Sequence, residues 1–419
     1  MPTDQFDSMT GHAARHDALD AAVEAPTFVG ATAPVDPAEG ATWLDTSGTP
    51  TLKVWVDGSP GSWVTAGGVG GGLTRFTESV NTSAPNATVP VVQLLATNAA
   101  TNVDAAFAPK GTGAILAQIP DNTAAGGNKR GVRGTDFQRQ RALATQVASG
   151  QESFIGSGIN NTSSGPQSCV VSGSTNTAGG TQSGVLSGVS NSASGSPSAV
   201  VTGQSNTASG QRAIVGGGLG NVASAENSGV LSGISNQATG VRSGVLCGES
   251  NTSSGESSWI PGGVNALTRG LFAAYAWSSA RRVSQGDNQC IGLPVQRETT
   301  NATLTILTAD RNAPSTTNVM VLPNNSCWTG TVHITGRSSG GDVYYRRIDV
   351  VGARGASAAT TTVKATNPDY TFTDTGLVGV SAAVVANTTR GSLEVEVTGL
   401  AATTIDWFAH FGAGNQIAR

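Results

Sequence analysis

Between Gly150 and Asn265 the apolar and polar positions of the chain repeat every 15 residues, with no insertion over eight turns. A fixed short period of this kind is typical of a solenoid, in which each repeat stacks on the next. Ile or Val recurs at 155, 170, 185, 200, 215, 230, 245 and 260, Asn at 161, 176, 191, 206, 221, 236 and 251, and Gly at 158, 173, 188, 203, 218, 233, 248 and 263. A second Gly series (150, 165, 180, 195, 210, 240 and 255) is interrupted only by Ala225.

Fifteen residues suit one coil of a parallel β-roll, with short strands joined by tight turns. The Gly and Asn positions predict corners, because Gly adopts positive φ without strain and Asn tolerates it. Stacked Asn side chains can also form hydrogen-bonded ladders. Helical repeats are longer, at about 30 residues or more, and use less Gly. A calcium-binding β-roll needs Asp in its turns, and residues 150–265 contain none.

Each coil has two apolar surfaces. Ile155 and its successors form one column, and a second face carries two positions per coil that pair a large with a small residue, as in Gly184 and Leu186. We expect both faces to be at least partly buried. Three apolar side chains contribute roughly 5 kcal/mol per coil, whereas ordering 15 residues costs on the order of 20 kcal/mol. The repeat therefore favours an obligate oligomer of parallel chains, without fixing their number.

Residues 267–419 lose the period and show short alternating segments that predict a C-terminal β-sandwich, jelly-roll-like in its strand lengths. The predicted strands are Thr303–Thr308, Thr331–Thr335, Tyr345–Val350, Thr360–Lys364, Leu393–Val397 and Thr404–His410.

The N-terminal third divides into smaller segments. Residues 1–26 have helical spacing and form either a frayed end or a plug that docks into an assembly. Residues 27–66 predict a small β-module with Trp43, Trp55 and Trp63 at its core, residues 67–72 a glycine-rich joint, and residues 73–149 a β-rich neck. The eight repeats then occupy 150–266. The fold class is thus all-β: an elongated fibre with a β-roll shaft and a short N-terminal helix.

Several of these segments resemble bacteriophage tail fibres. The tryptophan module, the stretch from Asn102 to Ile115 and the stretch from Gly131 to Arg139 look like segments of such fibres, and so does the order of the C-terminal strands. The repeat itself is similar to the shaft repeats of tail fibres and to head repeats of trimeric autotransporter adhesins. This resemblance implies a homotrimer in a virion, made in the host cytoplasm. It also implies an N-terminal part bound to tail or portal/adaptor proteins and a C-terminal part that contacts a host receptor, such as a glycan.

The composition excludes several function classes. Of 419 residues only 12% are charged and the net charge is −4, so sequence-independent nucleic-acid binding is not expected. The densest basic clusters, around Arg130, Arg141, Arg281 and Arg346, are interpreted as solvated strand edges. Four Cys lie far apart and four His are present, which argues against a structural zinc site. The first residues lack the pattern of a secretory signal, and no stretch is apolar enough for a membrane span.

No catalytic constellation stands out. The four Glu of the repeats are isolated in sequence, and Asp342, Asp349, Glu394 and Glu396 are interpreted as strand surface residues rather than a glycosidase pair. His333 and His410 lack a nucleophile elbow. His410 is interpreted as a half-buried strand residue, and the glycine-rich joint lacks the Lys of a P-loop. Aromatic residues that could bind a carbohydrate are interpreted as core of the sandwich. They are Trp277, Trp328, Tyr344, Tyr345 and Trp407.

The sequence thus predicts a non-enzymatic tail fibre with no cofactor, no metal and no catalytic residue. A head fibre or capsid decoration protein attached by the same N-terminal module is an equally compatible alternative. A polysaccharide-depolymerising tailspike is a second alternative, from the enzyme class, and a bacterial adhesin is a third.

Overall fold

A computed structural model describes residues 28–34, 41–47, 51–56, 62–65, 76–81, 91–96, 107, 109–281 and 283–418. The predicted N-terminal helix and the glycine-rich joint lie outside these residues. The chain divides into two compact units, Met1–Phe107 and Ala108–Arg419.

The first unit contains short strands. β1 to β4 form one sheet in chain order, and β5 pairs with β6 as an antiparallel hairpin. Trp43 is buried and donates its indole N–H to the Gly30 carbonyl at 2.9 Å, so a tryptophan does contribute to the core of this module. The strands are β1 Phe28–Gly30, β2 Thr42–Asp45, β3 Thr51–Val56, β4 Ser62–Thr65, β5 Phe76–Asn81 and β6 Val91–Ala96.

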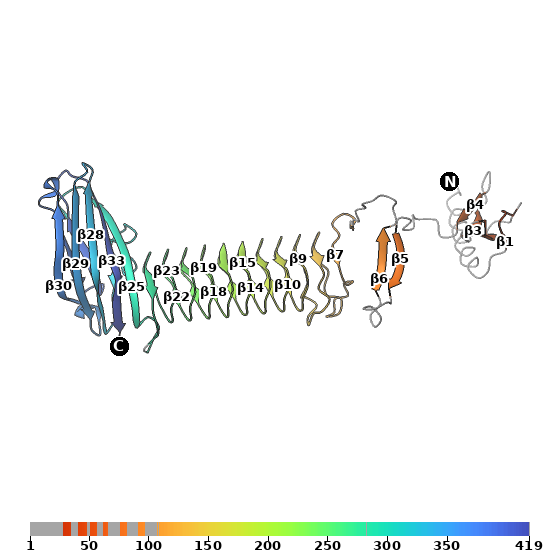
Figure 1. The fold of residues 1–419 in the computed structure, drawn as a ribbon, viewed down its shortest axis with the longest axis horizontal. Coiled ribbons are helices and arrows are strands. Elements are labelled where there is room, and N and C mark those ends of the chain that lie inside the picture. The colour runs from red at the N-terminus through yellow and green to blue at the C-terminus, as the bar shows by residue number, and fades with distance from the viewer. Residues whose placement is uncertain are drawn as a thin grey trace, which may run out of the picture. The chain divides into compact units, whose positions relative to one another are not determined.

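The second unit begins with a β-solenoid (Figure 1). From β9 to β22 each coil contributes one strand to each of two parallel sheets, and the coils at either end contribute to the longer sheet. The longer sheet contains β7 Ile115–Leu116, β8 Thr135–Asp136, β9 Phe154–Ile155, β11 Cys169–Val170, β13 Gly184–Val185, β15 Ser198–Val200, β17 Ala213–Val215, β19 Gly229–Val230, β21 Gly244–Val245, β23 Trp259–Ile260 and β24 Tyr275–Trp277. The shorter sheet contains β10 Thr162–Ser163, β12 Thr177–Ala178, β14 Ser192–Ala193, β16 Thr207–Ala208, β18 Val222–Ala223, β20 Gln237–Ala238 and β22 Thr252–Ser253.

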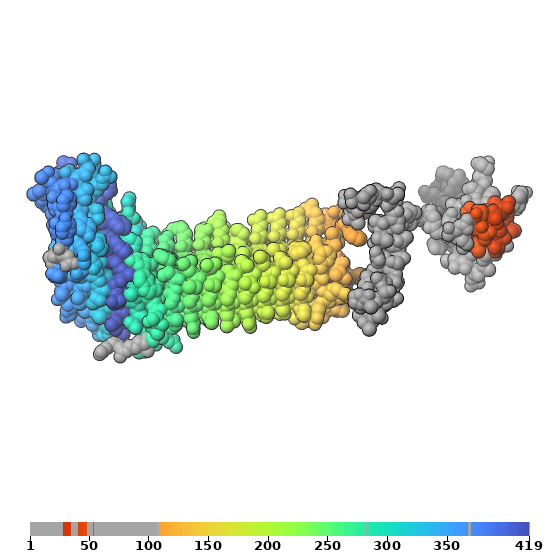
Figure 2. Space-filling view, viewed as in Figure 1, coloured from red at the N-terminus to blue at the C-terminus, as the bar shows by residue number. Residues whose placement is uncertain are grey.

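The predicted β-roll is therefore confirmed, and its register is the predicted one. Each strand pairs with the strand 15 residues later, so that Val170 lies opposite Val185 and Val185 opposite Val200. Stacking extends beyond the eight predicted repeats, from Ile115 at one end to Tyr275 at the other. In the space-filling view the coils stack directly on one another and run into the C-terminal strands (Figure 2).

The interior of the solenoid is narrow and is closed by the chain itself. It contains two apolar columns, one on each sheet. Val170 belongs to one column and Ala178 to the other, and both side chains are fully buried. Buried Ser and Asn fill the remaining interior positions, represented by Ser168 and Asn176. One face of the longer sheet is thus buried without a partner chain, while its outer face keeps exposed side chains, represented by Leu186.

The buried Asn residues form the predicted ladder. The backbone N–H of Asn206 donates to Oδ1 of Asn191 at 3.0 Å, and Oδ1 of Asn206 accepts the N–H of Asn221 at 2.9 Å. The Asn206 amide donates to the carbonyls of Thr202 and Gly218 at 3.1 and 2.9 Å. Each Asn therefore ties its own corner to the coils on both sides, which satisfies polar groups that would otherwise be buried without partners.

The corner glycines are required by both conformation and space. Gly203 has φ of +98°, and a Cβ at this position would lie 2.2 Å from the Gly218 carbonyl oxygen. Any side chain would push adjacent coils apart, so the Gly series is a condition for coil stacking.

A buried ionic cluster lies where the interior column ends. Asp136 occupies the register position next to Ile155, and its carboxylate lies 2.7 Å from Nε of Arg130 and 3.7 Å from Arg141. All three residues are buried, so the prediction that Arg130 and Arg141 lie at solvated edges was wrong. Gln138 continues the ladder, since its Oε1 accepts the N–H of Asn161 at 2.7 Å. These residues replace the apolar column with polar groups at the coil next to β7.

At the other end the longer sheet continues without a break into the C-terminal domain. β24 pairs antiparallel with β25, and the order proceeds through β33, β28 and β29 to β30. A second sheet of β26, β27, β31 and β32 completes the domain. The elements are β25 Asn288–Thr299, β26 Leu304–Ile306, β27 Met320–Val321, β28 Ser326–Ser338, β29 Val343–Arg354, β30 Thr362–Thr373, β31 Ser381–Asn387, β32 Ser392–Thr398, β33 Ile405–Ala418 and the 3-10 turns η1 Ala358–Thr360 and η2 Thr375–Leu377.

All six strands predicted for this region are present. The core includes Trp328 against Phe411, with ring centroids 5.6 Å apart, and Trp407 against Tyr344 at 5.5 Å. Glu394 is buried and forms an ion pair with Arg390 at 2.7 Å, so its interpretation as a strand surface residue was wrong.

Candidate functional site

The outer face of the longer sheet carries an uninterrupted apolar surface, which we call the outer stripe. It consists of the two outward positions of each coil from β9 to β23. Seven of its side chains are 37 to 63% exposed: Val171, Leu186, Val201, Ile214, Leu231, Leu246 and Trp259. The whole stripe comprises Phe154, Gly156, Cys169, Val171, Gly184, Leu186, Ala199, Val201, Ile214, Gly216, Gly229, Leu231, Gly244, Leu246, Trp259 and Pro261.

The alternation of large and small residues has a local cause. A Cβ on Gly184 would lie 3.2 Å from the Cys169 sulfur, and one on Gly229 would lie 3.3 Å from a methyl carbon of Ile214. Small residues therefore make room for large ones on adjacent coils of the same chain. The large residues themselves still face outward, so this compensation does not bury them.

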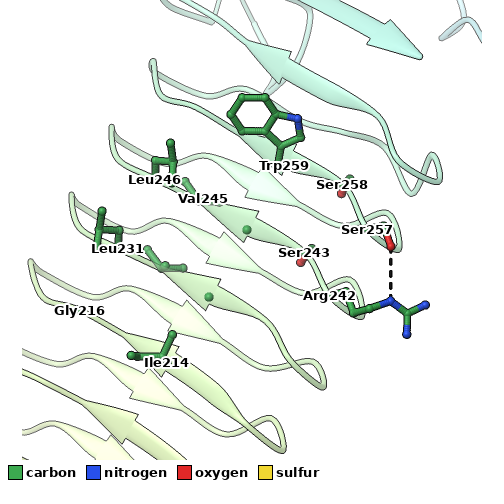
Figure 3. A pocket seen from close by; sticks show the side chains of 13 residues that line it. Ile214, Gly216, Leu231, Arg242, Ser243, Val245, Leu246, Ser257, Ser258 and Trp259 are labelled. Carbon is green, nitrogen blue, oxygen red and sulfur yellow. Dashed lines mark hydrogen bonds between the residues drawn. The ribbon is translucent and has the colours of Figure 1, made fainter. Parts of the chain in front are cut away.

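The stripe differs in polarity from the outer face of the shorter sheet. On β10 to β22 the outward positions are all Ser, Thr or Gln except Gly179 and Val222. On the stripe, by contrast, no position carries a charge, a hydroxyl or an amide side chain. Figure 3 shows Leu231, Leu246 and Trp259 projecting from consecutive strands beside a hollow of about 460 Å³, with Arg242 at its edge. The solenoid is thus strongly amphipathic across its thickness.

Beyond Trp259 the same sheet face becomes aromatic and partly polar. Tyr275 lies opposite Trp259 in register, stacks on Trp277 at 6.0 Å and joins its hydroxyl to Nε2 of His410 at 2.7 Å. A hollow of about 540 Å³ lies here, bordered by Trp259, Ala273, Tyr275, Pro294, His333, Thr335, Phe408 and His410. Trp259 borders this hollow and the one on the stripe, so the two surfaces are continuous.

Burial changes the titration of the central groups. Burial and then the nearby His333 lower the pKa of His410, and burial followed by the neighbouring Cys290 raises the pKa of Tyr275. Both shifts favour the neutral forms. A neutral imidazole beside a neutral phenol makes this a polar aromatic surface rather than an ionic one.

The aromatic candidates from the sequence separate into two groups. Trp328, Tyr344 and Trp407 are core residues, as expected. Trp277 is 40% exposed and Tyr345 is half-buried on the outer face, where its hydroxyl lies 2.9 Å from Nδ1 of His333, so their assignment to the core was wrong. His410 is half-buried, as predicted. The sequence did not reveal Tyr275, whose role depends on pairing with strands far along the chain.

Several acidic candidates are engaged in ion pairs. In the repeats, Glu152 pairs with Arg133 at 2.7 Å, Glu226 with Arg212 at 3.0 Å, and Glu256 with Arg242. Asp349 accepts the hydroxyl of Thr331 at 2.6 Å. Within the described residues no group of three or more His, Cys, Asp or Glu is arranged to hold a metal ion.

Comparison with known proteins gives a partial likeness to a solved structure. No protein-family model matches the sequence, and no curated protein is detectably similar to it. Among solved structures, the tailspike protein of Acinetobacter phage vB_ApiP_P1 aligns at 8% identity with a TM-score of 0.22. The alignment covers 68% of this chain and about half, 53%, of the tailspike chain. A TM-score this low establishes neither a shared topology nor a shared function. A search of the described helices finds none suited to crossing a bilayer.

Proposed function

We propose that the chain is a structural protein of a bacteriophage virion, a tail fibre that acts without enzymatic activity or cofactor. The observation that carries the proposal is the architecture of the second unit. A solenoid of uniform coils runs through one continuous sheet into a β-domain, which suits a stiff stalk that presents a terminal domain. The tail-fibre-like sequence segments supply the viral context.

In this proposal the N-terminal segments bind a tail or portal/adaptor protein, and the C-terminal domain contacts a host-surface receptor. Copies of the chain associate as a homotrimer. The outer stripe supports self-association, because its apolar side chains are half-exposed on one chain although the interior is complete. The ion pairing of Glu152, Glu226 and Glu256 supports a structural role for these carboxylates.

Immunogold electron microscopy tests the assignment. An antibody against residues 288–418 should decorate the distal ends of tail-attached fibres on virions that contain this protein, and pre-incubation with the antibody should reduce adsorption to host cells. Gold on the capsid would instead assign the protein as a head fibre. Absence of gold from all virion parts, with the protein present elsewhere in the lysate, would contradict the proposal.

A further inference from the structure

We infer that the outer stripe is the surface through which copies of this chain associate, parallel to one another and at the same axial level. The inference rests on the self-association proposed above and adds which face, which direction and which register. It does not depend on attachment to a virion.

The area supports a second copy as the occupant. The seven large side chains of the stripe leave on the order of 600 Å² of apolar surface, at the top of the range found on monomers. Trp277 and Phe408, which are 40 and 50% exposed on the same sheet, extend this. The total approaches the about 800 Å² that each partner contributes to a stable interface. A stripe without charged, hydroxyl or amide side chains is best covered by another apolar surface, such as the same stripe of a second copy.

A rival column of exposed apolar residues fits less well. Val189, Leu219 and Ile234 lie at the corner between the two sheets and are 44 to 47% exposed. In that column, however, Ser174, Gln204 and Glu249 occupy the intervening coils. Covering it would bury a carboxylate and an amide, which costs free energy unless the partner supplies hydrogen bonds.

The register follows from the order of large and small residues within each coil. Five coils place the larger residue second: Cys169 before Val171, Gly184 before Leu186, Ala199 before Val201, Gly229 before Leu231 and Gly244 before Leu246. Three coils are reversed, with Phe154 before Gly156, Ile214 before Gly216 and Trp259 before Pro261. Shifting one copy by a single coil, ~4.8 Å, would set reversed coils against unreversed ones and lose the fit. Turning one copy antiparallel about the Ile214 coil would set the reversed Trp259 coil against the unreversed Cys169 coil. The three reversed coils therefore fix the axial level and favour parallel copies.

Two matched variants test which face associates. Leu186→Ser, Leu231→Ser and Leu246→Ser together remove three outward side chains from the stripe. Val189→Ser, Leu219→Ser and Ile234→Ser together remove three side chains of similar exposure from the corner column. By light scattering the full chain and the column variant should be oligomeric and the stripe variant monomeric, with unchanged circular dichroism in both variants.

The outcomes distinguish failure of the stripe as the interface from failure of self-association itself. An oligomeric stripe variant would overturn the inference while leaving self-association intact. A monomeric unsubstituted chain would overturn both. If the stripe variant loses its circular dichroism signal, it has not folded. In that case cross-linking of single-cysteine variants that do fold tests which face associates.

Cross-linking with a short bismaleimide tests direction and register in a background with the native Cys replaced by Ser. Leu186→Cys should cross-link to itself, and so should Leu246→Cys, whereas the control Gln237→Cys on the polar face should not. A mixture of the two stripe variants should give no cross-link between positions 186 and 246. Such mixed cross-links without the self-links would indicate antiparallel copies centred on Ile214, and would overturn the inference.

Discussion

Replacing Asn206 by Ala tests whether the Asn ladder, rather than apolar burial alone, holds adjacent coils together. Asn206 is fully buried and sits in the middle of the solenoid. Its side chain donates two hydrogen bonds, which contribute about 1 kcal/mol each, and it accepts a third from the N–H of Asn221. The substitution also leaves the N–H of Asn221 without this acceptor in the interior, which costs a further 1–3 kcal/mol or so.

The expected loss is therefore about 3 to 5 kcal/mol in the free energy of unfolding. The Gly218 carbonyl keeps its hydrogen bond from the Gln204 N–H, so the loss of the Asn206 donor does not leave this acceptor unpaired. Asn206→Asp should be at least as damaging near neutral pH, because it retains the acceptor but buries a charge and replaces the donor. Acidification should partly relieve the Asp variant, since protonation removes the charge.

Urea denaturation followed by circular dichroism measures the effect. Gln237→Ala serves as the control, since Gln237 is exposed on β20 and should change stability by less than about 0.5 kcal/mol. A loss for Asn206→Ala within the range of the control would refute the reasoning. It would mean that the coils are held by their apolar columns and backbone ladders alone.

Three further predictions concern other parts of the second unit. Asp136→Ala should destabilise the solenoid by about 3 to 5 kcal/mol, because it leaves Arg130 and Arg141 buried without their counter-charge; thermal unfolding that matches the unsubstituted chain would refute this. Gly203→Ala should expose the coils on either side to protease, as its Cβ meets the Gly218 carbonyl; limited proteolysis at unchanged rate would count against it. Because the pKa of His410 is lowered in the folded chain, the unfolded chain binds the proton more tightly. The stability that depends on neutral His410 should be fully present above the ordinary pKa of 6.5, and the free energy of unfolding should fall as the pH drops below that value. Urea midpoints at about pH 7.5 and about pH 5.5 should differ more for the unsubstituted chain than for His410→Gln, and equal differences would contradict the assignment.

The repeat could be predicted from the sequence because each interior position is dictated locally. The positions of Val170, Gly173 and Asn176 recur at fixed spacing. Stacking in register buries the Val side chains, hydrogen-bonds the Asn side chains and accommodates the positive φ of the Gly residues. The early coils were missed because β7, β8 and β9 are separated by longer and unequal spacings. There Asp136 takes the place of an apolar residue.

The C-terminal strands were predicted where apolar and polar residues alternate, and missed where other features hide the pattern. β25 contains Gly292 and Pro294, which usually argue against a strand. Pro294 is tolerated because it lies beyond Gly292, the last residue that pairs with β24. β31 is rich in Ala and carries little apolar signal.

The outer surface was harder to assign than the interior. The pairing of large with small residues on the stripe predicted a face that partner chains bury at least partly, and on the single chain Leu231 is 63% exposed. The aromatic group around Tyr275 and His410 arises from strands 135 residues apart, and no local pattern reports such a pairing.

The continuous sheet also determines how the second unit would bear tension. Its coils are joined by hydrogen bonds that run along the solenoid axis, so a pull between the first coil and the terminal domain loads each coil-to-coil step in series. Most steps in the longer sheet align two or three residue pairs. The step from β23 to β24 aligns Trp259 with Tyr275 and is reinforced by a bridge between Gly263 and Ser278 and by a hydrogen bond from the Ala273 N–H to the Glu256 carbonyl. Under stretching, we therefore expect the load to be shared among the steps rather than concentrated at one of them.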